Sequence, residues 1–230
     1  MKDRTGAESR LGPLPSTATV LAVCAHPDDE SFGLGAALDT FVDRGSSTSV
    51  LVFTHGEASQ LGSALDLRSV RRAELNAAAK ELRVSHLKLL DHPDGALADR
   101  PLEQLTAQVG EFATLVGADL LLTFDEGGIT GHPDHQRATE AAVAHAERAG
   151  IAVLAWAIPR TVALTLNREY GASFVGRDEH QLDLVAQVGR LAQRRASACH
   201  ASQANGNPVL WRRLELLGDR EYFRWLIPPR

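Results

Sequence analysis

The sequence of 230 residues has only two cysteines, no long hydrophobic run and no excess of basic side chains. Two cysteines, Cys24 and Cys199, cannot form a disulfide framework, which excludes a small disulfide-stabilised fold and fits a reducing compartment. No apolar run approaches the roughly 18 residues that span a bilayer. The 24 Lys and Arg are outnumbered by 29 Asp and Glu, which argues against nucleic acid as a partner. We therefore expect a cytoplasmic globular protein without a membrane span.

What the sequence does contain is a regular alternation of short apolar segments and helical patterns. Strands are expected at 19–25, 49–54, 87–90, 119–124 and 151–156, and helices up to Arg44, over 66–82, after Pro101 and over about 135–149. Repeated strand–helix units predict an α/β fold, a Rossmann-like parallel sheet with helices on both faces. Beyond Pro159 the pattern weakens, with a strand expected at 161–166, a helix at 191–200 and a strand or helix at 221–226.

The domain organisation follows from the same pattern. Residues 1–18 carry charges and prolines without an apolar core, which predicts a flexible lead-in. Residues 19–230 are expected to form a single domain, with the part from about 160 to 230 packing on the main sheet. The stretch 211–230 holds five arginines and four aromatic residues. We interpret it as packing on the sheet or forming a subunit interface, with a basic patch for a partner as the alternative, so a homo-oligomer stays open.

Histidine and carboxylate residues gather where the predicted strands end. The first strand is followed by the run His26-Pro27-Asp28-Asp29-Glu30, the second by His55, the third by His92 and Asp94, and the fourth by the run His132-Pro133-Asp134-His135. The carboxyl ends of parallel strands share one edge of a sheet, and ligands of such folds bind there. The sequence therefore predicts a metal site or an acid–base site at that edge.

The two densest runs have the spacing of a metal site. Pro133 suits the first helical position, so His132 and His135, three residues apart, lie on one helix face. His26 and Asp29 have the same spacing. Either motif alone has an equally good structural explanation, because Pro-Asp pairs form turns and acidic residues favour helix starts. Together they favour a site, since two His nitrogens and one carboxylate form the usual protein half of a catalytic zinc centre.

The segments AHPDDE (25–30) and GHPDH (131–135) resemble the two hallmark motifs of the LmbE-like, or PIG-L-like, zinc de-N-acetylases. Weaker matches lie at Arg71-x-x-Glu74-Leu75, Asp94-Gly95 and His200-x-Ser202-Gln203, so the resemblance covers about residues 20–225. It implies removal of an acetyl group from N-acetylglucosaminyl compounds, which in the family include precursors of mycothiol, bacillithiol and glycosylphosphatidylinositol. One zinc ion per chain and an N-acetylated amino sugar as the small-molecule substrate are implied with it.

The same resemblance implies a role for each matching residue. The implied zinc ligands are His26, Asp29 and His135. Asp28 is implied as the general base, His132 as the residue that stabilises the oxyanion and assists departure of the amine, and Asp134 as a catalytic residue that orients an imidazole. The implied contacts to sugar hydroxyls are Arg71 and Asp94. Spacing alone does not exclude an exchange of the roles of Asp28 and Asp29. Thr130 stands where members acting on mycothiol precursors often carry Tyr.

Three other functions compete with this interpretation. A metal-dependent phosphoesterase could use a similar His/Asp set, but it would usually need a second metal, for which the sequence offers no clear ligand set. A non-haem iron oxygenase also uses two His and one carboxylate, although usually from a β-barrel. A non-catalytic binding protein is disfavoured because both Asp28 and His132 are retained.

Overall fold

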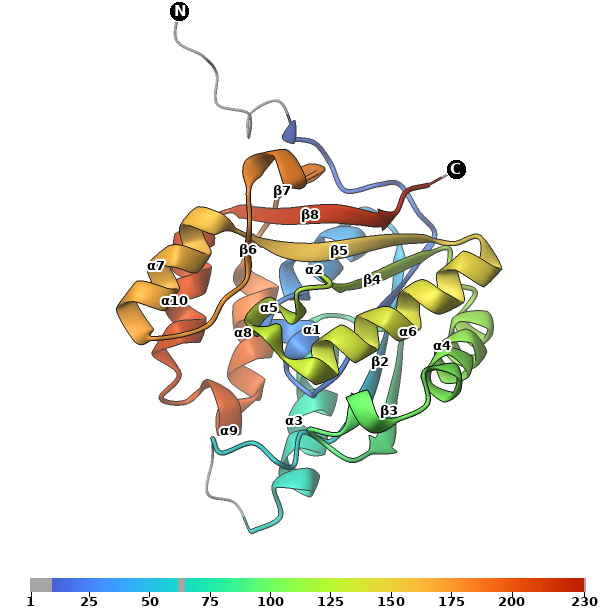
Figure 1. Ribbon diagram of the computed structural model, residues 1–230, viewed down its shortest axis with the longest axis horizontal. Helices are drawn as coiled ribbons and strands as arrows, with labels where there is room; N and C mark the ends of the chain where they lie inside the picture. The colour runs from blue at the N-terminus through green and yellow to red at the C-terminus, as the bar shows by residue number, and fades with distance from the viewer. Residues whose placement is uncertain (1–9, 62–64, 230) are drawn as a thin grey trace, which may run out of the picture.

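Five parallel strands form the centre of the protein (Figure 1). The structure, a computed structural model, describes residues 10–61 and 65–229. Each of the five predicted central strands is present: β1 (Thr19–Cys24), β2 (Ser47–Thr54), β3 (His86–His92), β4 (Leu120–Phe124) and β5 (Ala152–Pro159). Their order is β3-β2-β1-β4-β5, which confirms the Rossmann-like sheet. The order reverses between β1 and β4, and this switch point is where such folds bind ligands.

The last third of the chain extends the same sheet. β8 (Arg220–Ile227) pairs antiparallel with β5, and β7 (Leu184–Gln187) pairs antiparallel with β8. The short strand β6 (Gly176–Arg177) pairs with the end of β5. The sheet is therefore mixed at this edge and parallel elsewhere.

Helices cover both faces of the sheet. They are α1 (Asp29–Phe32), α2 (Gly35–Asp43), α3 (Leu67–Glu81), α4 (Leu102–Val116), α5 (Gly128–Gly131), α6 (Pro133–Ala149), α7 (Arg160–Tyr170), α8 (Leu191–Cys199), α9 (Ala201–Ala204) and α10 (Pro208–Leu217), with 3-10 turns at Leu97–Asp99 and Glu179–Gln181. Alternate residues of β1 point to opposite faces. Val20, Ala22 and Cys24 pack in the core with α2, α3, α7 and α8, whereas Leu21 and Val23 pack with α4 and α6. None of the helices in the described ranges combines the length and apolar character needed to cross a membrane.

One predicted strand is wrong. Residues 161–166 lie inside α7, not in the sheet. The buried residues of this helix are Val162, Ala163 and Leu166, and a spacing of three to four residues is the period of a helix face. The alternation that a half-buried strand requires is absent from this segment, so the β-branched residues misled the prediction.

The described residues before β1 contact the sheet and the loops beside it. Of the predicted lead-in, residues 1–9 lie outside the described part of the chain. Within residues 10–18, Leu14 is buried and the Gly12 amide donates to the Val185 carbonyl at 2.9 Å. The amides of Ala18 and Thr19 donate to the carboxylate of Asp119, which precedes β4. These contacts hold residues 10–18 against the sheet.

Candidate active site

The turn after β1 places two neighbouring carboxylates in different surroundings. Asp29 Oδ2 accepts the amides of Ala25 and His26 at 3.0 and 2.9 Å, which leaves Oδ1 directed elsewhere. Asp28 has a φ of 115°, a left-handed conformation that few residues other than glycine adopt. Because of this turn, adjacent side chains leave the backbone in different directions.

Three donor atoms from the two motifs converge beside this turn. His135 Nε2 lies 3.2 Å from His26 Nδ1 and 3.1 Å from Asp29 Oδ1, so the structure brings together the three predicted ligands. A tetrahedral zinc ion lies about 2.0–2.1 Å from each ligand atom, which separates the ligand atoms by roughly 3.3 Å. These two distances and the N, N, O donor set therefore fit a zinc ion. A second group, His26, His132 and Asp134, has donors within 4.8 Å but shares His26 with the first.

The outer nitrogens of the His26 and His135 imidazoles have acceptors. His26 Nε2 lies 3.0 Å from Asp94 Oδ1 and 3.3 Å from Asp134 Oδ2, and His135 Nδ1 lies 3.0 Å from the Gly128 carbonyl oxygen. Burial acts to lower the pKa of His26, but hydrogen bonds to Asp134 and Asp94 outweigh it and raise the pKa to about 10. Such acceptors fix which nitrogen of each ring faces a metal. Asp94, expected at a sugar hydroxyl, thus faces His26.

Asp134 ties the second motif to the loop after β3. Its carboxylate is fully buried and accepts the amides of Gly95 at 2.8 Å and Leu97 at 3.0 Å. Burial opposes ionisation, but the hydrogen bonds from His26 and these amides lower the pKa of Asp134. The structure therefore places Asp134 behind the His26 imidazole, where the orienting role was predicted.

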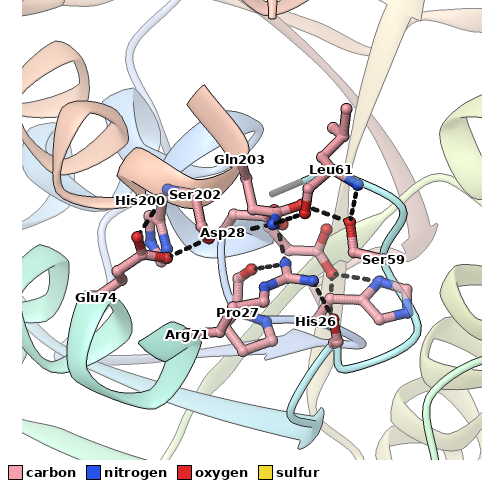
Figure 2. A network of polar contacts seen from close by, with 12 residues as sticks. His26, Pro27, Asp28, Ser59, Leu61, Arg71, Glu74, His200, Ser202 and Gln203 are labelled. Carbon is pink, nitrogen blue, oxygen red and sulfur yellow. Dashed lines mark hydrogen bonds and ion pairs between the residues drawn. The ribbon is translucent and has the colours of Figure 1, made fainter. Parts of the chain in front are cut away.

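Arg71 lies against Asp28. Its guanidinium donates to Asp28 Oδ2 at 2.7 Å, to the Gly56 carbonyl at 2.6 Å and to the Pro27 carbonyl (Figure 2). Burial raises the pKa of Asp28 to about 6, against the opposing charge of Arg71. The structure places Arg71 on this carboxylate, and its contact with a sugar stays a prediction.

His132 caps α6 and faces the other two imidazoles. Its Nδ1 accepts the Asp134 amide at 3.2 Å, and its ring centroid lies 4.9 Å from those of His26 and His135. Burial, together with the charges of His26 and His135, lowers the pKa of His132. A neutral imidazole beside the donor group is available as a hydrogen-bond partner and a proton carrier.

A cavity of about 570 Å³ opens onto these groups. Asp28, Asp29 and the three imidazoles line its floor, and Arg71 and Asp94 lie on the side of β2 and β3. On the side of β5 the wall is formed by Phe32, Phe124, Phe174 and Arg213. Arg213, from α10, was not predicted from the sequence. It is buried against the ring of Trp156 and donates to the Phe32 carbonyl at 2.8 Å, contacts that only the folded sheet creates.

Three other predicted histidines lie outside the donor group. His55 Nε2 lies 2.9 Å from Asp91, and His92 Nε2 lies 2.7 Å from Gln108, so these two are held at the edge of the sheet. His200 is fully buried and its Nε2 lies 2.7 Å from Glu30. A position after a strand end therefore correctly placed His26, His132 and His135 at the site, but it was misleading for His55 and His92.

The parallel sheet and the donor group at its switch point define a Rossmann-like α/β protein with a His/Asp metal-type centre. Residues 21–146 match the family model PIG-L: GlcNAc-PI de-N-acetylase. The chain belongs to this family.

Known proteins of this kind share parts of the chain or its fold. The 1D-myo-inositol 2-acetamido-2-deoxy-alpha-D-glucopyranoside deacetylase of Kineococcus radiotolerans is 31% identical over 165 residues, which cover 58% of this chain and 46% of the relative. The chain thus spans about half the length of this relative. The A40926 pseudoaglycone deacetylase Dbv21 superposes with a TM-score of 0.68 at 21% identity, over 91% of this chain and 97% of Dbv21.

The fold alone does not decide the reaction. GalB of Pseudomonas putida KT2440, a 4-carboxy-2-hydroxymuconate hydratase, superposes with a TM-score of 0.67 at 16% identity, over 93% of this chain and 98% of GalB. Since deacetylases and a hydratase share this architecture, the assignment of an activity depends on the residues of the site.

Proposed function

We propose that the protein is a zinc-dependent hydrolase that removes the acetyl group from an N-acetylglucosaminide-type small molecule. The observation that carries the proposal is the carboxylate of Asp28, which lies beside the donor group of His26, Asp29 and His135 without being part of it. Hydrolysis of an amide needs an acceptor for the proton of the attacking water. The position and the raised pKa of the Asp28 carboxylate suit it to that role.

The residues divide the reaction between them. His26, Asp29 and His135 would hold the zinc ion, which would supply Lewis-acid chemistry by polarising the acetamide carbonyl and lowering the pKa of the attacking water to roughly 7. Asp28 accepts the proton of the attacking water. His132 donates a hydrogen bond to the developing oxyanion and assists departure of the amine, which takes up the proton that Asp28 accepted from the water. Asp134 and Asp94 keep the His26 ring in the orientation that binding requires.

The sugar is proposed to lie on the side of Arg71 and Asp94, and the acetyl group on the side of Phe124. Thr130 lines the same cavity and can donate a hydrogen bond, but it is shorter than the Tyr found in members acting on mycothiol precursors. The panel of substrates should therefore extend beyond inositol glycosides.

The test is release of a primary amine from N-acetylglucosaminides that differ in their aglycone, measured together with metal content. One zinc per chain with amine release supports the proposal. Two metals per chain with turnover of phosphate esters would instead favour a phosphoesterase. The two donor groups argue against two metals, because both groups need His26.

A further inference from the structure

A buried pair lies behind the catalytic turn without reaching the cavity. His200, at the junction of α8 and α9, is fully buried, as is Glu30, and His200 Nε2 lies 2.7 Å from Glu30 Oε1. Neither residue lines the cavity, so neither can touch a substrate there or a metal ion held by the donor group. Their effect on the site must pass through another residue.

That residue is Asp28. The Asp28 amide donates to Glu30 Oε2 at 2.9 Å, while Glu30 Oε1 also accepts the Ser31 hydroxyl at 2.6 Å. Asp28 needs this support because its φ of 115° is unfavourable for a residue with a Cβ, and such a conformation persists only where its surroundings over-determine it. The positive φ is also what separates the directions of the Asp28 and Asp29 side chains.

The same C-terminal segment reaches the other side of Asp28. The Ser202 amide and hydroxyl each donate to the Glu74 carboxylate at 2.7 Å (Figure 2). Glu74 lies on α3 one turn after Arg71, the residue that donates to the Asp28 carboxylate. Gln203 accepts the Ser59 hydroxyl at 2.7 Å and donates to the Leu61 carbonyl at 3.1 Å, and both of these residues line the cavity.

From these contacts we infer that residues 200–203 form a positioning element for the catalytic base. His200 holds the backbone of Asp28 through Glu30, and Ser202 holds the helix that carries Arg71 through Glu74. The inference rests on the proposed function for the identity of the base. It assigns a role to His200, which does not line the cavity. A displacement of reacting groups by about 1 Å can cost roughly 100-fold in rate, so fixing this turn has a kinetic consequence.

The experiment compares His200→Ala and His200→Gln with the wild-type protein in its zinc-loaded form. His200→Ala should keep one zinc per chain and a KM within about threefold, and lose kcat by about 10- to 100-fold. Gln can place an amide donor near the position of Nε2, so His200→Gln should recover most of the lost kcat. Val109→Ala, which opens a cavity in α4 on the opposite face, is the control: it should lower the melting temperature and leave kcat unchanged.

Wild-type kcat in zinc-loaded His200→Ala overturns the inference, as does a His200→Gln variant no better than His200→Ala. If His200→Ala fails to fold, Ser202→Ala, which removes one of the two bonds to Glu74, must lower kcat a few-fold at unchanged zinc content. If the wild type releases no amine, the proposed function fails separately. A crystal structure of His200→Ala, or of Ser202→Ala where His200→Ala does not fold, then decides the inference: an undisturbed Asp28 turn and an undisturbed Asp28–Arg71 contact would overturn it.

Discussion

At the scale of single residues, the charges around Asp28 act in opposite directions. Burial raises the pKa of its carboxyl to about 6, and Arg71 at 2.7 Å restrains the rise. Asp29, one residue on, has its pKa lowered, because His135 and His26 and the His26 amide outweigh its burial. Two adjacent carboxylates therefore differ in proton affinity, the division expected between a ligand and a proton acceptor.

Asp28→Asn tests this division. An amide cannot accept the proton of the attacking water, so the variant should lose kcat by about 10²- to 10⁴-fold and keep its zinc. The matched control is Asp29→Asn, which should lose zinc because it replaces a ligand. Steady-state kinetics and metal analysis of the two variants give the answer. Loss of zinc in Asp28→Asn with retention in Asp29→Asn would exchange the two roles.

The pH dependence of the reaction tests Arg71. A base must be ionised to act, so kcat/KM should fall as the pH drops below about 6, the value to which burial raises the pKa of Asp28. Arg71→Met removes the charge that opposes this rise, and the acidic limb should move to higher pH. Arg68→Met is the control, because Arg68 lies on α3 but is bonded to Asp91. An unmoved limb with only a raised KM would instead make Arg71 a sugar contact.

At the scale of elements, Asp119 shows how the start of the chain is held. It accepts the Ala18 and Thr19 amides at 3.0 and 2.9 Å and the Thr17 hydroxyl. Partial burial opposes these hydrogen bonds, which nevertheless lower the pKa of Asp119. A lowered pKa stabilises the folded state above the unfolded value of about 4, and the contribution is lost as the pH falls through the folded pKa.

Asp119→Asn should therefore be slightly less stable at pH 7, by under about 1 kcal/mol because the carboxylate is exposed and screened. The difference from wild type should shrink below pH 4. Urea unfolding at both pH values measures it, with Asp99→Asn, another aspartate outside the donor group, as the comparison. A difference that grows in acid would contradict the assignment of the stabilisation to the ionised carboxylate.

The elements also show where sequence patterns suffice. β1 and β4 are apolar runs buried on both faces, so composition alone predicted them, and their ends carry the donor group. The strand expected at 161–166 was wrong because β-branched residues outweighed the helical spacing of Val162 and Leu166. The hydrogen bond between His200 and Glu30 joins residues 170 positions apart in the sequence. No local sequence pattern indicates that the end of α8 lies beside the turn after β1.

At the scale of the whole molecule, the sheet order explains the cavity. Arg71 and Asp94 lie toward β2 and β3, Arg213 and Phe124 toward β5 and β4, and the donor group lies at the switch point between them. The antiparallel strands β8 and β7 extend the sheet beyond β5, and α10 in this part of the chain supplies Arg213. The C-terminal third is thus a wall of the site and a support of its base.

Metal binding should couple the site to the stability of the whole fold. Zinc at about 100 times its Kd adds roughly 2.7 kcal/mol, or about 5–11 °C in Tm for a chain of this size. Chelation should remove this increment from the wild type and from Asp28→Asn, and should have no effect on His135→Ala. Zinc binding must displace the proton of His26, whose pKa is raised to about 10, so the increment should grow from pH 6 to pH 8. Thermal unfolding of the three proteins with and without chelator measures both effects. An increment in His135→Ala equal to that of the wild type would place the metal elsewhere in the protein.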